Sequence, residues 1–88
     1  MDISAIRAAL KHARVVLGAG RYDPTTAYAA VRRLKALAPP HIVPIAVKAE
    51  DAVLTSLEYR STDNEPLARY ALTKLISAME HAHLRVVD

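Results

Sequence analysis

"VVLGAGRYDPTT", residues 15–26, contains the signals that end one predicted helix and begin the next. Gly18 and Gly20 follow an apolar helical pattern, and glycine is the residue at which helices most readily stop. Asp23 is a suitable N-cap, because its carboxylate accepts hydrogen bonds from the free backbone amides of the following turn. Pro24 suits the first helical position, where its missing N–H costs no hydrogen bond. These residues predict the turn of a helical hairpin.

The same letters also match the beginning of a dinucleotide-binding loop, in which a strand runs into Gly-x-Gly. Such a loop requires a strand before the first glycine and a third glycine, which would fall at position 23. Asp23 occupies that position, where its carboxylate would repel a pyrophosphate, and helical periodicity covers the residues upstream of Gly18. We therefore interpret the stretch as a turn between helices, and we predict no cofactor.

Helical periodicity continues along most of the chain, and prolines mark the breaks. The expected helices cover about residues 3–17, Pro24 to the Ala-Pro-Pro break at 38–40, about 42–60, and a final segment that begins at an Asp63 or Asn64 cap. Four helices with short connections predict an all-α fold, a four-helix antiparallel bundle made of two αα-hairpins. The length fits a single helical domain over residues 1–88.

Apolar stripes on the last two predicted helices identify residues expected in the core. The stripe of the third helix contains Ile42, Ile45, Ala49, Ala52, Val53, Ser56 and Leu57. The stripe of the fourth helix contains Leu67, Ala71, Leu72, Leu75, Ala78, Met79 and Ala82. A second apolar patch lies on another side of the third helix, at Val43, Val47 and Leu54. A helix that is apolar on two sides is typical of a central position or of contact with another subunit.

The composition predicts a small core and, from it, self-association. The chain has no cysteine, tryptophan or phenylalanine and contains seventeen alanines, each of which buries little apolar area. A chain of this length buries only about 60–65% of its unfolded surface, so its stability is marginal. Marginal domains gain stability by pairing with a second copy. We therefore expect a homodimer, with Val43, Val47 and Leu54 at the interface.

Positive charge is concentrated in the first half of the chain. Residues 1–38 contain seven Lys or Arg against two Asp, a net charge of +5, whereas residues 39–88 contain five against seven, a net charge of −2. This asymmetry indicates either an anionic partner for the first half or head-to-tail complementarity between the two halves. If the first two helices form a hairpin, their cations make one basic surface, which consists of Arg7, Lys11, Arg14, Arg21, Arg32, Arg33 and Lys35.

The sequence indicates neither catalysis nor a metal site. Glu50 and Asp51 are adjacent and point about 100° apart on a helix, so they do not converge as a catalytic pair. His81 and His83 are two residues apart, and on a helix they point about 200° apart, so they bind one ion only if this segment is extended. No nucleophile motif accompanies them. We therefore predict no enzymatic activity.

Together these features predict a small interaction or regulatory module, homodimeric, that binds an acidic or apolar protein surface. The alternative is a nucleic-acid-binding regulator that uses the same basic residues, although the second helix offers no Asn or Gln to recognise bases. No targeting peptide is apparent, and no stretch approaches the roughly 20 apolar residues that span a bilayer. A cytoplasmic location with no membrane partner is expected.

Overall fold

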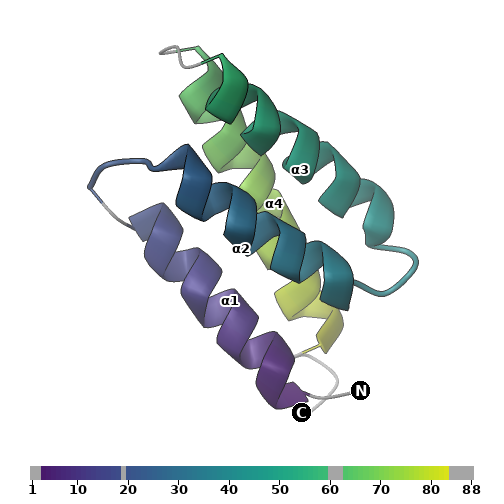
Figure 1. The fold of residues 1–88 in the computed structure, drawn as a ribbon. Helices are drawn as coiled ribbons and strands as arrows, with labels where there is room; N and C mark the ends of the chain where they lie inside the picture. Colours follow the sequence, from purple (N-terminus) through teal and green to yellow (C-terminus); the bar gives the residue numbers. More distant parts are fainter. Residues whose placement is uncertain (1–2, 19, 60–62, 84–88) are drawn as a thin grey trace.

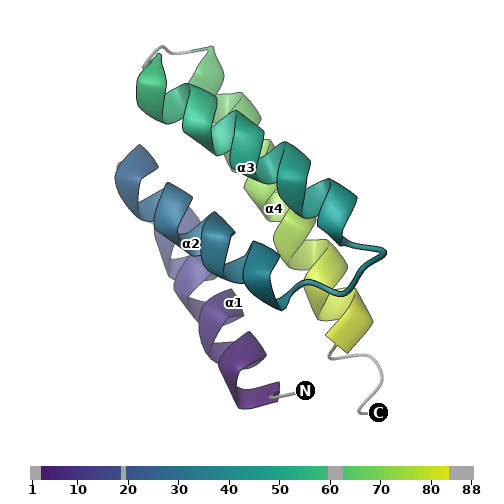
Figure 2. The same ribbon diagram turned by 45° about the vertical axis from the view of Figure 1, so that its right-hand side comes forward.

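The computed structural model describes residues 3–18, 20–59 and 63–83, and within them the fold is all-α with no strand. The four helices are α1 (Ile3–Gly18), α2 (Pro24–Leu37), α3 (Val43–Glu58) and α4 (Asn64–His83). Each helix packs on its neighbour in the chain, and α1 also touches α4, more loosely than the other pairs touch (Figures 1 and 2). The predicted all-α helical bundle is confirmed.

The turn between α1 and α2 has the predicted cap. Asp23 accepts a hydrogen bond from the backbone N–H of Thr25 at 3.1 Å and another from the hydroxyl of Thr26 at 2.6 Å, and Pro24 is the first residue of α2. Gly18 is the last residue of α1. Neither glycine has a positive φ, and a Cβ on either would meet nothing within 4 Å. Neither Gly18 nor Gly20 therefore adopts the left-handed conformation that favours glycine.

A side chain from α4 contributes to the end of α1. The last carbonyls of a helix have no partner within the helix, so they need one from elsewhere. Arg69 Nη1 donates a hydrogen bond to the carbonyl oxygen of Leu17 at 3.0 Å. The guanidinium also lies over the ring of Tyr22, 5.4 Å from its centroid. Its Nε lies 3.8 Å from the carboxylate of Glu65, an ion pair of i,i+4 spacing within α4. Arg69 thus connects α4 to the end of α1 and to the turn between α1 and α2.

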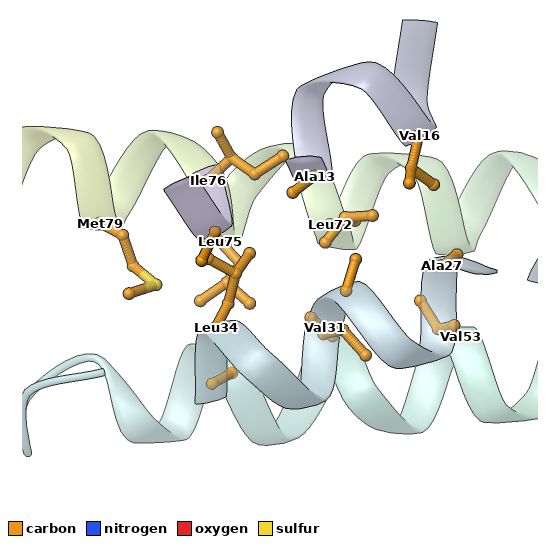
Figure 3. Close-up of a cluster of buried hydrophobic side chains, with 14 of the residues drawn as sticks. Ala13, Val16, Ala27, Val31, Leu34, Val53, Leu72, Leu75, Ile76 and Met79 are labelled. Carbon is orange, nitrogen blue, oxygen red and sulfur yellow. The ribbon is translucent and has the colours of Figure 1, made fainter. Parts of the chain in front are cut away.

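The core lies along the axis of the bundle, and all four helices contribute to it (Figure 3). The largest side chains come mainly from one face of α4, where Leu72, Leu75, Ile76 and Met79 are buried. Alanines occupy many of the facing positions, and small side chains allow the helix axes to approach closely. The fully or almost fully buried alanines are Ala9, Ala13, Ala27, Ala30, Ala46, Ala49 and Ala68.

The rotation of α4 about its axis differs from the prediction. Leu67 was expected in the core but is 62% exposed, whereas Ala68 and Ile76, outside the predicted stripe, are buried. The reason is that α4 contacts both α1 and α3, so its buried face points between these two helices. Helix α3 begins one residue later than predicted and ends at Glu58. Its buried face also differs from the predicted stripe, because Ala46 is buried and Ile45 is only partly buried.

One buried hydrogen-bond chain links the α1–α2 connection to α3. The Tyr22 hydroxyl lies 2.7 Å from Ser56 Oγ, and Ser56 donates its own proton to the carbonyl oxygen of Val53 at 2.6 Å. Because that proton is used, the Tyr22 hydroxyl donates to Ser56. Burial raises the pKa of the Tyr22 hydroxyl, because apolar surroundings destabilise the charged phenolate relative to the neutral phenol. This chain stabilises the packing of the turn on α3.

Candidate functional site

The groove between α1 and α4, which we call the α1–α4 seam, brings together three of the predicted basic residues. Arg7, Lys11 and Arg14 recur at spacings of four and three, so they lie on one face of α1. They line a cavity of about 390 Å³ whose other lining residues are Leu10, Val15 and Glu80. The seam therefore combines a cationic edge with exposed apolar surface, which Val15 supplies.

Arg14 is held across the seam by Glu80 of α4. Its Nε donates to one carboxylate oxygen at 2.8 Å and its Nη2 donates to the other, a two-pronged ion pair. The hydrogen bond and the charge of Glu80 raise the pKa of the Arg14 guanidinium. Neither Arg7 nor Lys11 takes part in an ion pair with any described residue. These two exposed cations are consequently the charges that the seam offers to a partner.

The other four predicted basic residues lie away from the seam. Lys35 pairs with Glu50 of α3 at 3.0 Å, on the flank where α2 meets α3. Arg32 lies over the ring of Tyr28, 5.7 Å from its centroid, and Arg33 is exposed on the same helix. Arg21 lines a neighbouring cavity of about 210 Å³ between the turn and α1, which shares Val15 with the seam cavity but contains none of the three seam cations. The seven cations are therefore distributed over several flanks and do not all line one groove.

The predicted interface residues form one stripe on α3. Val43, Val47 and Leu54 follow a helical spacing that also includes Glu50, the partner of Lys35, so the stripe lies toward α2. Val43 and Leu54 are partly buried, while Val47 is 38% exposed. Val47 is thus the member of the stripe with the most surface available to another molecule.

Two histidines that are distant in the sequence line the same cavity. His41, just before α3, and His81, in α4, border a space of about 470 Å³ with Ser77. Sequence spacing gives no signal for this pair, because forty residues separate them. α4 continues through His83, whose side chain lies outside the described residues. In the described ranges, no group of three or more His, Asp or Glu side chains is placed to hold a metal ion.

Comparisons with protein-family models, curated proteins and solved structures give no match to this chain. Among the described helices, none combines the length and the apolar character needed to cross a bilayer. The functional assignment therefore depends on the geometry of the surfaces described above.

Proposed function

We propose that the protein is a non-enzymatic binding module that holds an acidic segment of a partner protein in the α1–α4 seam. The observation that supports this function is that only one of the three cations in the seam has an acidic partner among the described residues. Arg14 is neutralised by Glu80, whereas Arg7 and Lys11 are exposed, line the same cavity as the exposed Val15, and have no acidic partner among the described residues. An acidic segment with one or two apolar residues complements such a surface in both charge and hydrophobicity.

The proposal includes the arrangement of the helices. We infer that α1 with α2 and α3 with α4 form antiparallel αα-hairpins, and the short connections between these helices support this. In that arrangement the seam is the contact between the first and last helices of the chain, which no loop bridges directly. A partner segment in the seam would stabilise the contact between α1 and α4, which is less extensive than the contacts between consecutive helices.

Reversing the two exposed charges of the seam tests the proposal. We expect the double variant Arg7→Glu/Lys11→Glu to bind a fluorescein-labelled peptide of mixed Glu, Asp and Leu at least about tenfold more weakly than the wild type, because attraction becomes repulsion. The measurement is fluorescence anisotropy at low and at physiological salt, and the wild-type affinity should fall as salt rises.

The matched control is Arg32→Glu/Arg33→Glu, which makes the same change of charge on α2, outside the seam. We expect it to retain most of the affinity. Equal losses in the two variants would show that net charge alone attracts the peptide, and would contradict a seam site. Tighter binding of a short DNA duplex than of the peptide would favour the nucleic-acid-binding alternative.

Self-association through α3 is a second part of the proposal, supported by the alanine-rich core and the exposure of Val47. We expect light scattering to give the mass of a dimer for the wild type and of a monomer for Val47→Glu, since the substitution places a charge in an apolar interface. Val15→Glu, at an exposed valine of α1, is the control and should remain dimeric. A monomer mass for the wild type at every concentration would refute this part.

A further inference from the structure

Two neighbouring cavities lie along the flank of α4 that faces α3, and we call them together the α3–α4 groove. Their volumes are about 200 Å³ and about 470 Å³, and they share Ile45. Along α4 the lining begins at Tyr70 and ends at Ala82. At a rise of 1.5 Å per residue this distance is about 18 Å, the length of roughly three helical turns.

The floor of the groove is apolar and made of small side chains. Ala71, Ala78 and Ala82 recur on one face of α4, are partly buried, and pack against the core, while the fully buried Ala49 of α3 lines the same cavity as Ala71. Because alanine has no atoms beyond Cβ, the backbone of an incoming helix can approach this floor closely. Ile45 supplies the one large aliphatic side chain shared by both cavities.

The rim of the groove is cationic and aromatic. Lys48 of α3 and Lys74 of α4 are exposed and line the smaller cavity, of about 200 Å³. Neither forms an ion pair with a described residue. Lys74 Nζ lies 5.9 Å from the centroid of the Tyr70 ring, which is 64% exposed. One turn earlier on the same side of α4, Leu67 is also exposed. No carboxylate is among the described residues that line either cavity.

We propose that the α3–α4 groove binds an amphipathic helix of a partner protein. The apolar face of that helix would pack on the alanine floor, and Glu or Asp beside this face would pair with Lys48 and Lys74. The length and small-residue floor of the groove suit the helix-in-groove mode of recognition, and the rim selects acidic flanks by charge complementarity. This surface lies on the opposite flank of α4 from Glu80 and the α1–α4 seam, and it recognises apolar periodicity as well as charge.

The test compares two labelled peptides of identical composition. One places Leu at the i, i+3, i+4 and i+7 positions with Glu on the flanks, and the other scrambles the same residues so that no apolar face forms. We expect the wild type to bind the amphipathic peptide about tenfold more tightly than the scrambled one. Amide chemical-shift changes in NMR spectra should map to α3 and to residues 70–82 of α4.

Variants at exposed positions of the rim leave the packed core intact. We expect Lys48→Glu/Lys74→Glu to weaken binding of the amphipathic peptide about tenfold and Tyr70→Ser to weaken it severalfold. The control Tyr59→Ser makes the same change at a similarly exposed tyrosine after the end of α3, outside both cavities, and should have little effect. Circular dichroism of each variant verifies that the helices remain folded.

Several results would overturn this inference. Equal affinities for the two peptides would show that the groove does not recognise an apolar face, and shift changes confined to α1 would place the peptide elsewhere. A dimeric wild type that becomes monomeric in Lys48→Glu/Lys74→Glu would mean that a second copy covers the groove. The variant Arg7→Glu/Lys11→Glu should retain amphipathic binding, so failure of the seam proposal and failure of this one are distinguishable.

Discussion

Leu72→Ala is expected to lower the free energy of unfolding by about 3 kcal/mol, because it removes three buried carbon atoms and leaves a cavity. Leu72 is fully buried on α4 and points into the cluster to which all four helices contribute (Figure 3). The neighbouring helices contribute many alanines, and an alanine cannot change rotamer to fill the space. For a domain of this size the loss is a large fraction of the total stability.

Urea and thermal unfolding followed by circular dichroism measure this effect. We expect the thermal midpoint to fall by roughly 15 °C. Leu67→Ala is the matched control, since it is the same substitution on the same helix and the predicted core stripe included both positions. Because Leu67 is 62% exposed, its replacement should change the stability by less than about 0.5 kcal/mol. A loss at position 67 as large as that at position 72 would show that α4 is rotated differently.

Ser56→Ala is expected to lower the free energy of unfolding by about 2 kcal/mol, although it removes only one oxygen atom. Ser56 is 3% exposed and accepts the hydrogen bond of the Tyr22 hydroxyl, so the substitution leaves a buried donor without an acceptor. In the double variant Tyr22→Phe/Ser56→Ala both partners are absent. Its loss should therefore be smaller than the sum of the two single losses, and the difference is the coupling free energy. Additive losses would refute the buried hydrogen bond.

The pH dependence of stability supplies an independent measurement of the same site. Burial raises the pKa of Tyr22 in the folded state above its unfolded value near 10. The folded state is therefore favoured below that value, and this contribution is lost as the pH rises through the higher folded pKa. We expect the urea midpoint of the wild type to fall as the pH rises from the unfolded pKa near 10 through the higher folded pKa, and Tyr22→Phe to reduce this fall. An unchanged slope in Tyr22→Phe would contradict the burial of the hydroxyl.

The helices of this protein follow from local sequence. Asp23 and Pro24 start α2 because an N-cap and a first-turn proline act within one turn of backbone, and the observed cap has the expected bonds. The periodic apolar residues likewise predict four helices, and the predicted bounds of the first three and the predicted start of the fourth agree with the structure to within one or two residues. Such signals depend on residues that are three or four positions apart, so the sequence alone determines the all-α class and the turn at residues 18–23.

The surfaces depend on contacts that no local pattern predicts. Arg14 meets Glu80 across 66 positions and Tyr22 meets Ser56 across 34, and both pairs exist because of how the helices pack. The wide apolar stripe of α4 is compatible with several rotations about the helix axis. Packing against both α1 and α3 selects the rotation that buries Ala68 and exposes Leu67. Tertiary structure therefore decides which cations remain available in the α1–α4 seam, because burial and ion pairing are properties of the packed helices.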